Sequence, residues 1–325
     1  MEVSDTQSIW YAVVNIFAAS KKAGKMWRGA EKRLREDGVQ FCCAMTGDHG
    51  NAMTLASAAC ERGYRRFIAV GGDGTVHDVL EGIMVFINSR RLSGGHVSLS
   101  DFTLAIIPVG SGNDWIKTAG VPKDILKASK LLSSGTVRKQ DVVRVNLLDP
   151  GALPEEKAIH VSYMANVGGI GLDARVCERV NLAKSQGKKG RYLYVTALIY
   201  NIIHRVPSRA KVICDGVEVF DGSYLSIAFG IGKYSGGGMR QTPDAEIDDG
   251  LLDMTIIPDL PIMKIAKEAP KLFNGKFLTV KELVSARFRS VLVMADDPVE
   301  VDGEVVGAAP VRFDVLDGQL NILCP

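Results

Sequence analysis

The sequence has little that would direct the chain to nucleic acid, to zinc or across a membrane. Its 39 Lys and Arg residues nearly balance 37 Asp and Glu, so a net charge of +2 leaves no basic excess for nucleic acid phosphates. The apolar runs are too short to cross a bilayer. The five histidines lack the spacing of metal ligands, which argues against zinc. The sequence also contains no internal repeat and no low-complexity segment.

Cysteine pairs and a secretion signal are missing as well. The six cysteines include no Cys-x-x-Cys pair and fall mostly in apolar segments, which is typical of reduced core residues. The N-terminus lacks the basic region and cleavage site of a secretory signal. We therefore expect a cytoplasmic protein. Its 325 residues, 46% hydrophobic and 23% charged, suffice for about two globular domains.

The most informative stretch is the segment 66–83. Its apolar residues 67–70 predict a buried strand, and apolar residues at helical spacing from Val76 to Ile83 predict a helix. Between them stands Gly71-Gly72-Asp73-Gly74-Thr75. Glycines, which have no Cβ, let a phosphate approach the free N–H groups at a helix start. We expect Asp73 to hold Mg²⁺ beside that phosphate; a purely structural use of the glycines is the alternative.

Strands and helices alternate through the first part of the chain. The expected strands are 10–16, 39–44, 67–70 and 104–108, and the expected helices are 21–36, 51–62, the one after the glycine turn, and 123–133. This order predicts right-handed βαβ units and a mostly parallel sheet. Ligands of such sheets bind beyond the carboxyl ends of the strands. Asn15, Thr46 and the glycine turn all fall at such ends.

A second turn rich in small residues follows the strand at 104–108. Its members are Gly110, Ser111, Gly112, Asn113 and Asp114. Small residues again permit close approach of the backbone, and the polar side chains can bond a ligand. The alternative is a loop in which Asn113 or Asp114 caps the next helix. Because two such turns end strands of one domain, we favour a ligand site.

The rest of the chain is rich in β-structure. The expected strands are 141–148, 159–166, 210–214, 224–229 and 251–257, with more between 290 and 323, and helical insertions at 172–204 and 261–273. Strands joined mostly by turns predict an antiparallel sandwich. We therefore place an α/β domain at 1–139 and a β-sandwich domain at 140–325. Roughly the last twelve residues are candidates to pack back on the first domain.

Two acidic clusters lie in this second part. The first, at 244–250, brings four carboxylates together, including Asp248 and Asp249. Close acids repel one another unless a cation such as Mg²⁺ or solvent relieves them, so both a metal site and a solvated turn stay open. The second cluster ends in Asp302-Gly303-Glu304. Asp-Gly is ordinary hairpin chemistry, and the residues alone favour a turn there.

These motifs, in this order, resemble the soluble diacylglycerol kinase family, which includes bacterial lipid kinases and is related to sphingosine and ceramide kinases. The resemblance runs from Trp10 to Pro325. It rests on Gly71–Thr75, Pro108–Asp114, Asp248–Asp253 and Asp302–Glu304. The first motif is shared with NAD kinases and loosely with phosphofructokinases, whereas the second and fourth point to lipid kinases.

The resemblance implies an N-terminal α/β nucleotide-binding domain with an NAD kinase/phosphofructokinase-like sheet, a C-terminal antiparallel β-sandwich domain, and an active site in the cleft between them. Members transfer the γ-phosphoryl group of ATP to a lipid hydroxyl with Mg²⁺. Diacylglycerol, which becomes phosphatidic acid, is the default acceptor. Because the second domain must then close on the first, domain motion is expected.

The resemblance also assigns roles to residues. The nucleotide-binding residues would be Asn15, Thr46, Gly71, Gly72, Asp73, Gly74, Thr75, Gly110, Ser111 and Asn113. The metal-binding residues would be Asp73 and Asp114 for the catalytic Mg²⁺ network, and Asp248 and Asp249 for a structural Mg²⁺. The catalytic residues would be Glu304 as general base, Asp302 in support of it, and Asp73.

One segment departs from the family. Members usually have Asn-Pro and a glycine in the first loop, where this chain has Asn15-Ile16-Phe17-Ala18-Ala19-Ser20, and Gly24 is the nearest substitute. The shape of this loop, and with it the choice of nucleotide, is therefore open. The motif residues that carry the chemistry are intact.

Several alternatives stay open. An NAD kinase shares the glycine turn; sphingoid bases, ceramide or phosphatidylglycerol are other acceptors; and a nucleotide- or lipid-binding regulator is the non-enzymatic reading. A kinase without a membrane segment must visit the bilayer surface. Lys184, Lys188, Lys189 and Arg191, with the basic helix at 21–35, are either contacts to anionic headgroups or ordinary solvated residues. A homodimer is equally open.

Overall fold

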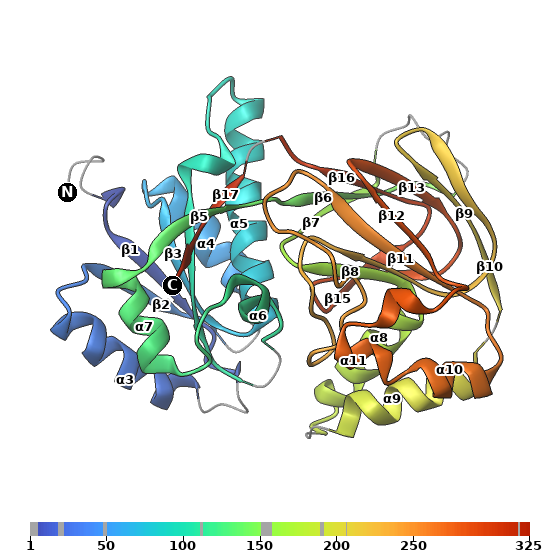
Figure 1. The fold of residues 1–325 in the computed structure, drawn as a ribbon. Coiled ribbons are helices and arrows are strands. Elements are labelled where there is room, and N and C mark those ends of the chain that lie inside the picture. The colour runs from blue at the N-terminus through green and yellow to red at the C-terminus, as the bar shows by residue number, and fades with distance from the viewer. Residues whose placement is uncertain are drawn as a thin grey trace. The chain divides into compact units, whose positions relative to one another are not determined.

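The computed structural model describes residues 6–18, 23–47, 51–110, 113–150, 158–188, 192–205, 207–317 and 319–325, without the side chains of Lys184 and Tyr192. The chain divides into two compact units. The first comprises Met1–Val142 and Asp317–Pro325, and the second comprises Val143–Leu316 (Figure 1). The end of the chain therefore belongs to the same unit as its beginning.

The first unit is built on a six-stranded sheet with the order β2-β1-β3-β4-β17-β5. Its strands are β1 (Trp10–Val14), β2 (Phe41–Met45), β3 (Arg66–Gly71), β4 (Thr103–Pro108), β5 (Thr136–Gln140) and β17 (Leu320–Cys324). All neighbours pair in parallel except β17 and β5, which are antiparallel. This sheet confirms the expected α/β class.

Helices surround this sheet. They are α3 (Ala23–Glu36), α4 (Ala52–Glu61), α5 (Asp73–Leu92), α6 (Trp115–Ala119) and α7 (Ile125–Ser134), with a 3-10 turn, η1, at Leu99–Asp101. The core forms because apolar residues recur on one side of each helix. Trp27 and Leu34 of α3, for example, share a buried cluster with Val14, Ile68 and Ile107 of the sheet. The carboxyl ends of β1, β3 and β4 are thereby held in register beside one another.

The second unit consists of eleven strands in one continuous antiparallel sheet. They are β6 (Val143–Leu147), β7 (His160–Met164), β8 (Val167–Gly171), β9 (Ser208–Cys214), β10 (Val217–Gly230), β11 (Leu252–Pro258), β12 (Val284–Phe288), β13 (Ser290–Met294), β14 (Pro298–Val301), β15 (Glu304–Ala308) and β16 (Val311–Val315). Strands β6 to β16 enclose one apolar cluster, in which Phe229 and Phe313 stack with ring centroids 4.3 Å apart. This sheet confirms the expected antiparallel sandwich.

Within the described residues, four helices and a 3-10 turn complete the second unit. They are α8 (Leu172–Ser185), α9 (Tyr192–Ile203), α10 (Ile262–Glu268), α11 (Lys271–Asn274) and η2 (Phe277–Thr279). The helices α8 to α11 occupy the two expected insertions, whereas η2 follows the second of them. In the described part of the chain no helix combines the length and apolarity needed to span a membrane.

Some expectations differ from the structure in detail. The strand expected at 159–166 ends at Met164, and a separate strand, β8, follows at Val167–Gly171. We did not expect β8, because glycines are depleted in strands. The expectation that the cysteines are core residues is wrong for Cys42 and Cys43. Both are exposed, because β2 lies at the edge of its sheet, whereas the other four are buried.

Candidate active site

In the first unit, the ends of β1, β2 and β3 are tied to one another by polar side chains. The Asn15 amide nitrogen Nδ2 donates to Thr75 Oγ1 at 3.1 Å. The backbone N–H of Ile16 donates to Thr46 Oγ1 at 3.3 Å. The structure thus brings Asn15, Thr46 and Thr75 to one edge of the sheet, as the βαβ pattern predicted.

The turn from β3 into α5 allows no side chain at Gly71. A Cβ built there would stand 2.1 Å from Thr75 Oγ1, far inside contact distance. The carbonyl of Gly71 also accepts the N–H of Val109 at 2.8 Å, which joins this turn to the one after β4. Gly72 is the N-cap of the 20-residue helix α5, whose positive end faces this turn. The region suits an anion at the start of α5.

Asp73 joins the two turns of the first unit. Its carboxylate accepts the backbone N–H of Asp114 at 2.8 Å and that of Trp115 at 3.1 Å. These N–H groups belong to the first turn of α6, so Asp73 caps that helix from 41 residues away in sequence. A carboxylate is also an oxygen ligand of the kind that Mg²⁺ prefers, so Asp73 is a candidate to bind a cation.

Asp114 is the N-cap residue of α6 by position, but its own side chain makes no capping bond. Instead its carboxylate pairs with Lys117 Nζ at 2.6 Å. Sequence analysis did not single out Lys117. The spacing of three residues on a helix is a usable signal for such a pair, although it recurs on many solvated helices.

Asn113 is a buried polar residue in the second turn. The residue is 5% exposed, and its Nδ2 donates to the carbonyl of Gly110 at 3.2 Å. Its Oδ1 has no hydrogen-bond partner within the described ranges. Buried oxygens of this kind are rare and need a donor. The neighbouring Ser111 lies outside the described residues.

In the second unit, Asp302 and Gly303 form the turn of the β14–β15 hairpin. Their φ angles are +51° and +91°, the left-handed pair that a two-residue Asp-Gly hairpin requires. The Asp302 carboxylate accepts the N–H groups of Ala165, Asn166 and Val167 at 2.7, 2.9 and 3.1 Å. Asp302 is 6% exposed. Its carboxylate therefore fixes the turn between β7 and β8.

Glu304, in contrast, is exposed at the start of β15. The backbone of the preceding residue is well held, because Asn181 Nδ2 of α8 donates to the carbonyl of Gly303 at 3.3 Å, and Glu300 Oε2 accepts the Gly303 N–H at 2.9 Å. The Glu304 carboxylate has one long contact, from Asn181 Nδ2 at 3.4 Å. Sequence analysis did not find Asn181, since nothing local links it to a turn 122 residues away.

The acidic segment 244–250 is next to an arginine. Arg287 forms an ion pair with Asp249, and its Nε donates to Asp253 at 3.1 Å. Burial raises the pKa of Asp253, and Arg287 opposes that rise. Across the described ranges, no three His, Cys, Asp or Glu side chains are grouped to hold a metal. The arginine relieves part of the expected repulsion, and the structural Mg²⁺ at Asp248 and Asp249 stays a prediction.

Both parts of the chain match models of known protein families. Residues 10–145 match the diacylglycerol kinase catalytic domain, and residues 166–324 match the YegS C-terminal NAD kinase beta sandwich-like domain. The chain belongs to the diacylglycerol kinase family of lipid kinases. Membership confirms the resemblance drawn from the motifs and makes this lipid kinase a phosphotransferase.

Individual relatives cover nearly the whole chain. A diacylglycerol kinase from Mycobacterium tuberculosis is 27% identical over 97% of this chain and 94% of its own length. A protein from Pseudomonas aeruginosa named "Probable lipid kinase YegS-like" is 29% identical over 92% and 89%. The solved structure of a diacylglycerol kinase from Bacillus anthracis superposes with a TM-score of 0.73 at 23% identity, covering 98% of this chain and 97% of that one. The last similarity establishes the fold.

Proposed function

We propose that this lipid kinase transfers the γ-phosphoryl group of ATP to the hydroxyl of diacylglycerol, giving phosphatidic acid, with Mg²⁺ as cofactor. The observation that carries the proposal is the exposed carboxylate of Glu304 on a hairpin whose other acid, Asp302, is fixed by three backbone N–H groups. An exposed carboxylate on a rigid support is what a substrate hydroxyl needs as a proton acceptor.

The first unit would bind the nucleotide. Gly71–Thr75 leads into the N-terminus of α5, where a phosphate gains from the helix dipole and close backbone approach. Asn15 and Thr46 border this turn through the bonds to Thr75 and Ile16. In the turn after β4, the buried Oδ1 of Asn113 would accept a donor group of the nucleotide. Gly110 and Ser111 of the same sequence motif would contribute to nucleotide binding as well.

The carboxylates of Asp73 and Asp114 would hold the catalytic Mg²⁺. Both are oxygen ligands of the kind that this cation prefers, and the two backbone bonds of Asp73 hold its carboxylate in place. When bound, Mg²⁺ neutralises phosphate charge during the transfer. Asp73 would orient that charge from a fixed position, because α6 holds its carboxylate in place. Asp114 is already balanced by Lys117, which keeps the local charge low in the free protein.

Glu304 would act as the general base. An alcohol is a weak nucleophile at neutral pH, and a carboxylate within hydrogen-bond reach accepts its proton as the bond to phosphorus forms. Such assistance contributes typically 10²–10⁴-fold to the rate. Asp302 would support Glu304 by holding the hairpin turn.

The identity of the acceptor lipid is the most specific part of the proposal. A diacylglycerol kinase among the relatives favours diacylglycerol. A sphingoid base, ceramide or phosphatidylglycerol would use the same base and nucleotide groups. NAD kinase is the second enzyme class, because its β-sandwich gives the C-terminal domain family its name. The cytoplasmic location and a homodimer stay predictions.

The deciding experiment measures ATP consumption with Mg²⁺ against a mixed-micelle lipid panel headed by diacylglycerol and, in parallel, against NAD⁺. We expect turnover that depends on diacylglycerol, requires Mg²⁺ and is absent with NAD⁺. Turnover on another lipid would keep the kinase and replace the acceptor. Turnover on NAD⁺ alone would overturn the lipid assignment for this chain.

A non-catalytic regulator is tested in the same assay. It would bind nucleotide, measured by calorimetry, without consuming it in the presence of any lipid.

A control with Ca²⁺ in place of Mg²⁺ tests the metal requirement. It separates a specific need for Mg²⁺ from general charge screening, because Mg²⁺ demands a tighter octahedral site than Ca²⁺.

A further inference from the structure

The second unit exposes an unusual number of large apolar side chains on its helices. Of the nineteen such side chains that are exposed within the described ranges, nine lie on α8, α9, α10 and α11. Figure 1 shows these four helices at one end of the second unit. The nine side chains are Leu182, Tyr194, Val195, Ile199, Tyr200, Ile203, Ile262, Met263 and Phe273, here called the apolar helical surface. Single exposed apolar residues are normal, whereas a concentration of them marks an interaction site.

Helix α9 is apolar on opposite sides. Leu193, Ala197 and Ile202 pack into a cluster with α8 and α10. Val195, Ile199 and Ile203, spaced by four residues, form a second stripe that is 51%, 52% and 58% exposed. A helix that is hydrophobic all round is normally buried or in a membrane. With 12 residues α9 is too short to span a bilayer, which takes about 20.

Helix α10 adjoins α9 in the second unit. Arg205, just after α9, donates from Nη2 to the carbonyl of Leu260 at 3.0 Å and from Nε to Asp259 at 2.9 Å. These bonds place the end of α9 beside the start of α10. Ile202 of α9 and Ile265 of α10 also pack against the same apolar cluster. Met263, on α10, is 82% exposed, so exposed apolar residues lie on both of these adjoining helices.

The charge of these helices is strongly positive. Segments 172–188, 192–205 and 261–276 contain nine Lys and Arg against three Asp and Glu, while the rest of the chain has 30 against 34. Exposed members include Arg179, Lys188, Lys267 and Lys276. The guanidinium of Arg179 lies over the ring of Tyr200 at 3.5 Å, so cation and apolar surface adjoin. This combination fits an anionic surface with an apolar interior.

We propose that the apolar helical surface docks the second unit on an anionic lipid bilayer. The α9 stripe and Met263 enter the boundary between headgroups and acyl chains, and the surrounding lysines and arginines contact the headgroups. The inference rests on the proposed function in one respect, since a lipid acceptor resides in such a bilayer. A second copy of this chain is a poorer occupant, because a two-fold interface would set these like-charged surfaces against each other.

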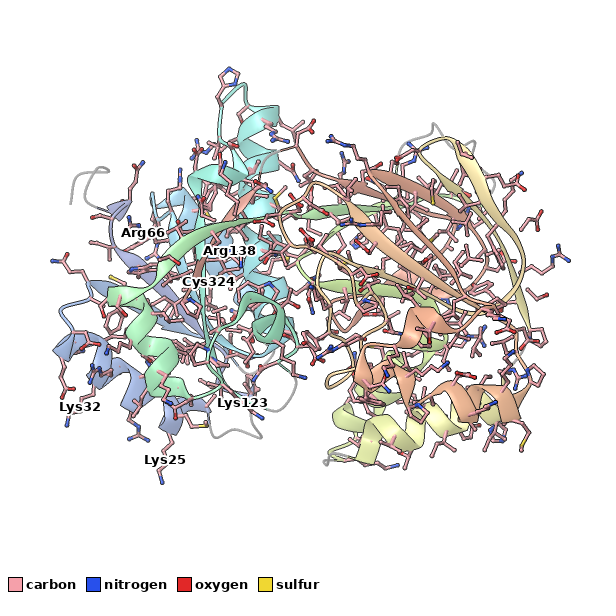
Figure 2. The ribbon with its side chains drawn as sticks, viewed as in Figure 1. Lys25, Lys32, Arg66, Lys123, Arg138 and Cys324 are labelled. Carbon is pink, nitrogen blue, oxygen red and sulfur yellow. The ribbon has the colours of Figure 1, made fainter. Side chains whose placement is uncertain are left out.

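Helix α3, the basic helix at 21–35 in the sequence, does not share these properties. Its apolar residues Trp27 and Leu34 are buried. Three of its cations lie beside acids, in the pairs Lys32–Glu36, Arg33–Asp37 and Arg35–Glu31. Figure 2 shows Lys25 and Lys32 projecting outward from α3. Lysine and arginine side chains on a helix without an exposed apolar stripe are typical of a solvated face. We therefore assign docking on the bilayer to α8–α11 alone.

Co-sedimentation of the full chain with vesicles, without nucleotide, tests the proposal. The vesicles are phosphatidylcholine with or without about 30 mol% phosphatidylglycerol. The test variant is Val195→Ser/Ile199→Ser/Ile203→Ser. The matched control is Leu92→Ser/Val137→Ser/Val217→Ser, which removes three apolar side chains elsewhere that are at least as exposed. We expect at least about tenfold weaker binding of the test variant to anionic vesicles, and no more than about twofold for the control.

Two further variants separate charge from packing. Lys267→Glu/Lys276→Glu should weaken binding to phosphatidylglycerol vesicles and reduce its dependence on salt. Met263→Ser alone alters one side chain that is 82% exposed, so it keeps the test valid if the triple variant unfolds. Thermal unfolding of every variant checks the fold. The proposal would be overturned if Met263→Ser and the triple variant, when folded, both bound anionic vesicles as tightly as wild type does.

Other outcomes also overturn it. If the wild-type protein fails to bind anionic vesicles, it has no such docking surface. If the test variant changes only the oligomeric state, the surface binds a second copy of this chain instead. Vesicle binding is measured without turnover, so its result is valid even if the chain phosphorylates no lipid.

Turnover gives a second comparison. When the acceptor is dispersed in detergent micelles, the test variant should phosphorylate it at the wild-type rate. When the acceptor is in vesicles, the rate of the test variant should fall.

Discussion

The glycine turn at 71–75 and the hairpin turn at 302–304 use their carboxylates in different ways. Asp73, in the first unit, accepts two N–H groups of α6 and is also the proposed ligand of a cation. In the second unit the work is divided: Asp302 accepts three N–H groups and is buried, while Glu304, two residues on, is exposed. An acid within a motif can therefore be an anchor, a ligand or a reactive group, and its backbone bonds help to separate these roles.

The largest expected effect is that of Glu304→Gln on turnover. Because Gln cannot accept the proton, kcat should fall by about 10²–10⁴-fold, or about 3–5 kcal/mol of barrier. Glu304 is exposed, so the free energy of unfolding should change by less than about 0.5 kcal/mol. Steady-state kinetics and urea unfolding measure the two quantities. Wild-type kcat in this variant would remove Glu304 from the mechanism.

The next effect concerns Asp302 and stability. Asp302→Gly keeps the left-handed backbone but leaves three N–H groups without their acceptor, so unfolding should become easier by about 2–4 kcal/mol. Asp302→Asn, which keeps a neutral acceptor and tolerates positive φ, should lose about half of that. Denaturant unfolding compares them. If both variants are as stable as wild type, the Asp302 carboxylate is not an anchor.

Asp73→Asn should combine a large effect on activity with a smaller one on stability. The Asn amide group would face one of the two N–H donors of α6, which costs about 1–2 kcal/mol of unfolding free energy. Loss of the charge should raise the Mg²⁺ concentration needed for half-maximal turnover. A Mg²⁺ titration of ATP consumption measures this shift. An unchanged titration would make Asp73 an anchor only, like Asp302.

A smaller, pH-dependent effect contrasts two other acids of the second unit. Burial raises the pKa of Asp173 above 3.8, although Ser226 and Gln241 donate to it, because both donors are neutral. Burial also acts on Asp297, but bonds from Tyr224, Arg175 and Ser208 outweigh it and hold the pKa below 3.8.

These shifts have opposite consequences for the free energy of unfolding. The Asp173 contribution favours folding at low pH and is lost as pH rises from 3.8 through its raised pKa. The Asp297 contribution is present above pH 3.8 and is lost as pH falls through its lowered pKa. Asp173→Asn should therefore flatten the fall in stability above pH 3.8, and Asp297→Asn should weaken the fold mainly above it. Unfolding curves across pH test both signs, and identical profiles would refute the contrast.

The sequence predicted local features better than distant ones. The glycine turn at 71–75 was recognisable because strand, turn and helix follow one another directly. The anchoring of Asp302 was not, since its partners lie some 135 residues earlier and follow β7, whose end we had placed at 166. Strand β5 was also missed, because its sequence Thr-Val-Arg-Lys-Gln is polar and mostly exposed at a sheet edge.

The same limit applies to the surface. Apolar residues 192–203 correctly predicted a helix, but periodicity alone cannot tell which of two apolar sides is covered. The pairing of Asp249 with Arg287 was equally hidden, because it joins a turn to β12 across 38 residues. In both cases the tertiary fold, rather than the local pattern, decides the surroundings of each side chain.

The position of β17 has a consequence for how the chain acquires its structure during synthesis. This strand, made from the last residues, lies between β4 and β5 and is paired to both. During synthesis the first unit therefore has a gap in its sheet, although most of that unit is translated first. The second unit is a continuous segment, Val143–Leu316, and is translated before β17. The glycine turns, which begin where β3 and β4 end, therefore gain the support of the complete sheet only after the second unit has been translated.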